Sequence, residues 1–80
     1  MQNLIEAITL VNKGKWDKAH KIVQGENSIF SNWIHANLHR QEGDIGNALF
    51  WYSRCKKEMP KSNISFEAER EIILNKILEQ

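Results

Sequence analysis

The sequence predicts an all-α protein made of two helical hairpins and a capping helix, about five helices in one domain of residues 1–80. Apolar residues recur at helical spacing in five segments, and the one proline and three of the four glycines fall between these segments. Neither the alternating apolar runs of strands nor the Asn-Gly and Asp-Gly turns of β-hairpins occur. Because a chain of 80 residues buries only a thin core, we expect marginal stability.

The first hairpin is expected over residues 3–25. In residues 3–13, apolar side chains at i, i+1, i+4 and i+7 form one stripe, and Gly14 ends this helix with a left-handed turn. Residues 16–24 carry a second apolar face, and Gly25 closes their helix. The two helices are therefore expected to pack against each other.

The second hairpin is expected over residues 28–59. Ser28 is a suitable N-cap for its first helix, which ends at Gly43. Asp44 is expected to cap the next helix, because its carboxylate can accept hydrogen bonds from the amides two or three residues further on. Pro60 prevents that helix from continuing.

The last helix is expected over residues 64–79, with Ser65 as its N-cap. In the helix before it, Phe50, Trp51 and Tyr52 are separated by about 100° each around the axis, so they cannot all face one core. At least one of them must be covered by the last helix, a partner chain or a ligand. Two hairpins and a cap fall short of the three or more repeats that usually stabilise such arrays, so the sequence predicts a homodimer.

The two hairpins share a pattern at an offset of 29 residues, which pairs Ala7 with Ala36 and Ala19 with Ala48. Small residues at these positions let antiparallel helices approach closely. The second hairpin resembles the tetratricopeptide repeat, and the residues that carry the resemblance are Ala36, Gly43-Asp44-Ile45, Ala48, Tyr52, Cys55 and Pro60. This resemblance implies helix–turn–helix units that act through contact with other proteins.

The match to this repeat has two departures. The first hairpin follows the pattern more loosely, and the link over residues 24–29 is shorter than the repeat's period requires. In addition, Asn32, His35, Ala36 and His39 stand where the repeat usually has its Trp-Leu-Gly-Tyr set. Ordinary core packing is therefore not expected around the two histidines.

A second resemblance covers roughly residues 14–55. The chain is similar to a group of short bacterial proteins of about this length, and the resemblance implies a shared polar signature without a mechanism. That signature consists of Trp16-Asp17-x-Ala19-His20, Trp33-x-His35-Ala36-x-Leu38-His39-Arg40-x-Glu42-Gly43-Asp44, Asn47-Ala48 and Trp51-Tyr52-x-Arg54.

His35 and His39 are four residues apart and so share one helix face, as two ligands of a metal site would. The glutamate that follows the first histidine in helical metalloprotease motifs is absent, since Ala36 stands there. The favoured interpretation buries the histidines between helices, each bonded to a carbonyl, Gln24 or Asn47. The alternative is a metal site whose third ligand is His20, Glu42 or Asp44.

Arg40 admits a structural and a functional interpretation. It can offset the carbonyl dipole at the end of its helix and pair with a carboxylate. Alternatively, Arg40, His35 and His39 converge as an anion pocket beside aromatic rings. Acid–base chemistry by a histidine is possible, but no nucleophile motif, phosphate loop or carboxylate pair accompanies it. The candidate binding residues are His20, His35, His39, Arg40, Trp33, Trp51 and Tyr52.

The leading functional hypothesis is a small non-catalytic helical-repeat protein that acts through protein–protein contact as a homodimer, with no cofactor and no assigned metal ligand. A peptide groove would involve the first and third helices, with Asn37, Arg40 and Gln41 as polar contacts. The alternative is a ligand- or metal-binding protein, conceivably a minor enzyme, that uses a His/Arg pocket.

Charge and cysteine content argue against several other classes. A formal net charge of +1 gives no basic patch for nucleic acid. Cys55 is the one cysteine, so a disulfide scaffold is excluded and a reducing, cytoplasmic location is expected; its small-residue position favours packing over reactivity. No apolar run approaches the ~20 residues of a membrane span, and the first residues lack the basic region of a signal peptide.

Overall fold

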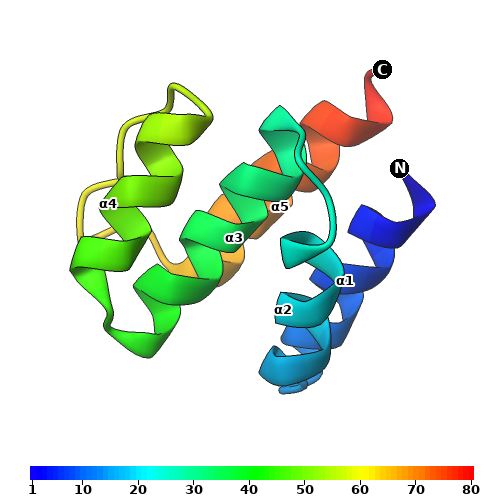
Figure 1. Ribbon diagram of the computed structural model, residues 1–80, viewed down its shortest axis with the longest axis horizontal. Helices are drawn as coiled ribbons and strands as arrows, with labels where there is room; N and C mark the ends of the chain where they lie inside the picture. Colours follow the sequence, from blue (N-terminus) through cyan, green and yellow to red (C-terminus); the bar gives the residue numbers. More distant parts are fainter.

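The computed structural model describes residues 1–80, and every regular element in it is a helix (Figure 1). The predicted all-α fold with five helices is therefore confirmed. The helices are α1 (Gln2–Asn12), α2 (Trp16–Gln24), α3 (Ile29–Glu42), α4 (Ile45–Arg54) and α5 (Phe66–Leu78). None of the five combines the length and the apolar character needed to cross a membrane.

Helix α3 lies at the centre of the molecule. In Figure 1 it runs between α4 on one side and α1 and α2 on the other, and it contacts all four of the other helices. Ten consecutive residues of α3, from Ser31 to Arg40, are buried. A helix buried on every side needs partners for its polar residues as well as its apolar ones. The polar side chains of α3 accordingly form hydrogen bonds with α5.

The helices pack in sequence-adjacent pairs, α1 against α2 and α3 against α4, while α5 packs on α3 and α1. The core forms at these contacts and includes the alanines that the 29-residue offset pairs, all four of which are fully buried. Its apolar members are Leu4, Ala7, Ile8, Val11, Ala19, Val23, Trp33, Ile34, Ala36, Leu38, Ala48, Tyr52, Cys55, Ile73 and Ile77. Cys55 is thus a packing residue, and burial raises the pKa of its thiol.

The expected helix caps are observed. Ser28 accepts a hydrogen bond from the Ser31 amide in a reciprocal capping box, and Ser65 accepts one from Ala68 N. Asp44 caps α4 through a 3.3 Å bond from Asn47 N. Gly14 and Gly43 adopt φ values of 82° and 88°, the left-handed conformation that ends a helix at low cost only for glycine.

The end of α4 differs from the sequence-based expectation. Pro60 does not end this helix, because α4 already ends at Arg54. Lys56 adopts a left-handed φ of 59°, and the amides of Lys56 and Lys57 return to the carbonyls of Ser53 and Tyr52. This is the hydrogen-bond pattern that usually recruits glycine, and here a lysine occupies the left-handed position.

Candidate functional site

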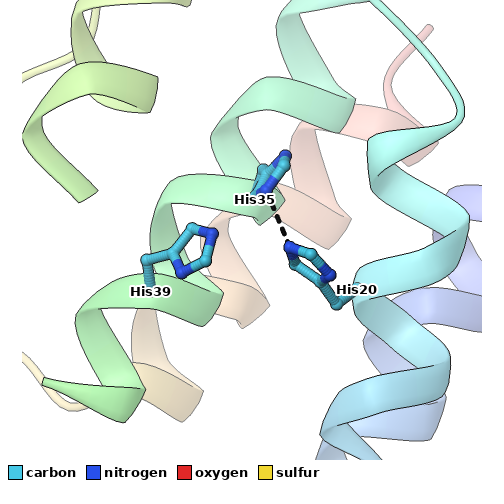
Figure 2. Close-up of side chains that lie close together, drawn as sticks. All are labelled: His20, His35 and His39. Carbon is cyan, nitrogen blue, oxygen red and sulfur yellow. Dashed lines mark hydrogen bonds between the residues drawn. The ribbon is translucent and has the colours of Figure 1, made fainter. Parts of the chain in front are cut away.

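The three histidines of the chain converge between α2 and α3 (Figure 2). His20 comes from the middle of α2, and His35 and His39 from successive turns of α3. The Nε2 atoms of His20 and His35 lie 3.0 Å apart, and one ring nitrogen of each histidine lies within 4.8 Å of the others. We call these three side chains the histidine cluster.

Two tryptophans flank the histidine cluster. Trp51 of α4 stacks on His35 with ring centroids 3.9 Å apart, and Trp16 of α2 stacks on His20 at 4.8 Å. Hydrogen bonds fix the orientation of both indole rings: Trp16 Nε1 donates to Leu38 O at 2.9 Å, and Trp51 Nε1 donates to Asn47 Oδ1 at 3.1 Å. The imidazoles are thereby confined to a narrow range of orientations.

The third imidazole is oriented by a carboxylate. His39 Nδ1 lies 2.7 Å from Glu42 Oε2, one helical turn further along α3. In this contact the N–H at Nδ1 donates to the Glu42 carboxylate, and a ring with this single hydrogen has a free lone pair on Nε2. Asp44 also lies within 4.8 Å of this pair.

The environment keeps two of the imidazoles neutral. Burial, followed by the neighbouring rings of His20 and His39, lowers the pKa of His35 to about 4. Burial and the proximity of His39 also lower the pKa of His20, while Glu42 and Asp17 oppose this shift. At neutral pH these two rings are therefore uncharged Lewis bases.

Two buried polar atoms beside the histidine cluster have no hydrogen-bond partner, His35 Nδ1 and Asn32 Oδ1. Both belong to α3, and their residues are 3% and 4% exposed. Asn32 is held on its other side, where Nδ2 donates to Asn27 Oδ1 at 3.3 Å. Such atoms are uncommon in folded proteins, and each one calls for a physical account.

The hydrogen-bond partners expected for the histidines are wrong. Neither Gln24 nor Asn47 nor a backbone carbonyl accepts from an imidazole; His20 and His35 contact each other, and His39 contacts Glu42. Asn47 is engaged by Trp51 and Asp44, while Gln24 is exposed. The sequence showed that His35 and His39 share a face but could not show that α2 presents His20 to that face.

The predicted pocket combining Arg40 with the histidines does not form. Counted from Trp33 at about 100° per residue, Arg40 lies near the angle of Trp33, whereas His35 and His39 lie roughly on the opposite side of α3. Arg40 faces α5 and the loop before it: NH1 donates to Glu69 Oε1 of α5 at 3.1 Å, and NH2 donates to the Ile64 carbonyl of the loop. Its charge is thus already paired inside the protein.

Arg40 belongs to a second cluster of side chains around Glu69, which also includes Trp33 and Tyr52 and which we call the Glu69 cluster. Glu69, a residue the sequence analysis did not single out, is 2% exposed and accepts from four side chains. Its donors are Trp33 Nε1 at 3.1 Å, Asn37 Nδ2 at 2.8 Å, Arg40 NH1 at 3.1 Å and Tyr52 OH at 2.7 and 2.9 Å. Burial and Glu69 raise the pKa of Tyr52, so its hydroxyl remains a donor.

The expected peptide groove is filled by α5. Asn37 is fully buried, and its Oδ1 accepts from Arg70 NH1 at 2.9 Å. Arg70 also donates to Gln41 Oε1 at 2.6 Å and, through Nε, to Asn12 Oδ1 at 2.8 Å. Asn37, Arg40 and Gln41 therefore bind the protein's own last helix, so that they are not positioned as contacts for a peptide.

Of the seven candidate residues, the structure brings His20, His35, His39 and Trp51 together and assigns Trp33, Arg40 and Tyr52 to the Glu69 cluster. A pocket of about 250 Å³ lies next to the Glu69 cluster, between the start of α4 and the loop before α5. Its lining residues are Arg40, Ile45, Met59, Pro60, Ser62 and Phe66. The histidine cluster is thus a separate site.

Comparison with known proteins identifies no relative: no protein-family model, no curated protein and no solved structure matches the chain. The functional argument consequently depends on the histidine cluster itself.

Proposed function

We propose that this protein binds a divalent transition-metal ion, with Zn²⁺ as the first candidate, through the imidazoles of His20, His35 and His39. The observation that carries the proposal is the convergence of three ring nitrogens from two helices within 4.8 Å. Imidazole is a ligand suited to zinc, copper, iron and nickel.

The spacing of the nitrogen atoms is close to what such an ion requires. Zinc–nitrogen bonds of about 2.0–2.1 Å in tetrahedral geometry place the ligand atoms about 3.3 Å apart. His20 Nε2 and His35 Nε2 are 3.0 Å apart, and the widest separation among the three nitrogens is at most 4.8 Å. Entry of the ion requires side-chain rotations and the loss of the hydrogen that lies between the Nε2 atoms of His20 and His35.

The low proton affinity of two of the imidazoles also favours metal binding. A metal ion competes with protons for imidazole, so a histidine that is already neutral binds with less competition. The pKa of His35 at about 4 and the lowered pKa of His20 remove this competition for two ligands at pH 7. The hydrogen bond between His39 Nδ1 and Glu42 orients the third ring, as carboxylates often do for metal-bound histidines.

The test is a metal titration of protein purified without a histidine tag and treated with a chelator. Zn²⁺ binding is followed by calorimetry, and Cu²⁺ or Co²⁺ binding by the fluorescence of Trp51 and Trp16, which stack on ligand rings. We expect one ion per chain and quenching by the paramagnetic ions.

Substitution of a ligand must weaken this binding more than the 10–100-fold typical of a residue that only orients a ligand. His20→Gln, His35→Gln and His39→Gln are the informative variants, and Lys18→Ala, exposed on α2, is the matched control that retains wild-type affinity. Absence of binding at micromolar concentrations of all these ions, or equal affinity of the His35→Gln variant, would contradict the proposal.

A second candidate function is protein–protein contact, with a second copy of the chain as the simplest partner. It is supported by an apolar ridge on α4, formed by Ile45, Leu49 and Phe50, which are 44%, 49% and 51% exposed. Among the helices, α4 contacts only α3, so no other helix covers its outer face. The similarity of this hairpin to the tetratricopeptide repeat agrees with such a role, as does a reducing cytoplasmic location for the free thiol of Cys55.

A further inference from the structure

We propose that Asn32 is a positioning residue for His35: its Oδ1 accepts the hydrogen of His35 Nδ1 and so directs the lone pair of His35 Nε2 into the histidine cluster. The consequence for metal affinity rests on the proposed function, whereas the hydrogen position is a property of the protein without metal.

The starting observation is the pair of unpartnered atoms. His35 Nδ1 and Asn32 Oδ1 are the buried side-chain polar atoms that lack a partner, and their residues are more than nine-tenths buried. An unsatisfied buried polar group costs about 1–3 kcal/mol. The two residues are three apart on α3, which puts their Cβ atoms about 5–6 Å apart on one face of the helix. At this spacing a side-chain rotation can bring the ring hydrogen of His35 Nδ1 into direct contact with Asn32 Oδ1.

The chemistry of the pair selects one position for the hydrogen. A neutral His35 has a single ring hydrogen, and its Nε2 lies 3.0 Å from His20 Nε2, so one of these two nitrogens must donate to the other. If the His35 hydrogen were on Nε2, Nδ1 would be a buried acceptor beside the acceptor Asn32 Oδ1. With the hydrogen on Nδ1, Asn32 accepts it, and His35 Nε2 accepts from His20. Of the two arrangements, only the second pairs the two buried atoms with each other.

The same arrangement is the one that a metal ligand needs. Coordination through Nε2 requires that the ring hydrogen is on Nδ1 and that this hydrogen has an acceptor. His39 has such an acceptor in Glu42, three residues after it, and Asn32 lies three residues before His35 on the same helix. The Asn32 amide is oriented from the other side by Asn27, so its oxygen is the atom that remains for His35.

The first experiment determines the ring hydrogen of His35 by ¹⁵N NMR in the metal-free protein at pH 7, well above the His35 pKa of about 4. We expect the Nδ1–H form in the wild type and a shift towards the Nε2–H form in Asn32→Leu, which has a similar shape but no acceptor. Asn32→Asp retains an acceptor oxygen and is expected to keep the Nδ1–H form. Asn27→Ala removes the contact to Asn32 Nδ2 without touching an imidazole, so it controls for the loss of that bond.

The second experiment measures Zn²⁺ affinity in the same variants. Asn32→Leu is expected to bind 10–100-fold more weakly than the wild type, and Asn32→Asp at least as tightly as Asn27→Ala. An Nε2–H ring in the wild type, or an unchanged ring in Asn32→Leu, overturns the assignment of Asn32. Should the hydrogen move as expected in a protein that binds no metal, the proposed function fails and the assignment stands. The Asn32→Asp and wild-type spectra retain the test if the leucine variant does not fold.

Discussion

The imidazole of His35 is 3% exposed, is stacked on Trp51 and has the rings of His20 and His39 within 5 Å. A group held neutral in this way links the stability of the protein to pH. The unfolded chain takes up a proton at His35 below its ordinary pKa of 6.5, whereas the folded protein does so only near pH 4. The contribution of His35 to folding is therefore fully present above pH 6.5.

We expect the free energy of unfolding to fall between pH 6.5 and pH 4 by roughly 3 kcal/mol on account of His35 alone, since each pKa unit corresponds to about 1.4 kcal/mol. Urea titrations at several pH values measure this loss. Carboxylates contribute in the same range, so the comparison with His35→Gln isolates the histidine: the stability difference between wild type and variant should shrink as the pH falls. A difference that stays constant from pH 7 to pH 4 would refute this account.

At the same scale, the sequence was a good guide to shared faces and a poor guide to partners. The four-residue spacing of His35 and His39 puts both on one side of α3 wherever that helix packs. The seven-residue spacing of Trp33 and Arg40 likewise places both on the opposite side of α3. The contact of His35 and His39 with His20 depends on how α2 crosses α3, and no local sequence pattern determines that crossing.

At the scale of the helix, local signals predicted the starts and most of the ends, and the end of α4 is the exception. Ser28, Asp44 and Ser65 cap as expected because a side-chain oxygen before a helix has neighbouring amides within reach. The end of α4 was misassigned because its left-handed residue is Lys56 rather than glycine. Pro60 marked the latest possible end of that helix, and the actual end is set by hydrogen bonds back to Ser53 and Tyr52.

Lys56 and Gly43 both adopt the left-handed backbone conformation, but only Lys56 has a side chain. Substitutions at the two positions should therefore change stability in opposite directions. Lys56→Gly relieves the cost of a side chain at φ 59° and should stabilise the protein by about 0.5–1 kcal/mol. Gly43→Ala should destabilise it by about 1–2 kcal/mol through backbone strain alone, because an added Cβ meets no atom within 4 Å. Thermal or urea denaturation measures both effects.

The exposed position Lys61 provides the matched control for the first substitution, since Lys61→Gly adds the same flexibility without a left-handed residue to relieve. Stabilisation by Lys61→Gly equal to that by Lys56→Gly would show that the left-handed conformation is not the cause.

At the scale of the molecule, the all-α class and the number of helices followed from the sequence because apolar spacing is a local property. The position of α5 did not follow. Its buried Glu69 and Arg70 face the polar side of α3, so the predicted surface for a partner is occupied by the chain itself. The α4 ridge, by contrast, is apolar, so its side chains carry no polar groups from which a partner could be predicted.

Self-association through the α4 ridge predicts a dimer at tens of micromolar protein. Leu49→Glu should convert it to a monomer with unchanged helix content, because Leu49 is 49% exposed and a charge opposite its symmetry mate disfavours the contact. Ile72→Glu, a matched exposed apolar position on α5, should leave the dimer intact. Sedimentation equilibrium and circular dichroism measure both properties. A wild-type protein that sediments with the mass of one chain would rule out the dimer.

Glu69 also bears on the order in which the molecule can assemble. Residues of α3 and α4 are synthesised before those of α5. Four of their side chains donate to the carboxylate of Glu69, which the ribosome adds seventeen residues after the last of them; the four are Trp33, Asn37, Arg40 and Tyr52. Until that residue emerges, a cation and three other donors must stay hydrated, which opposes closure of the second hairpin. We therefore expect the second hairpin of the nascent chain to remain open until α5 is available.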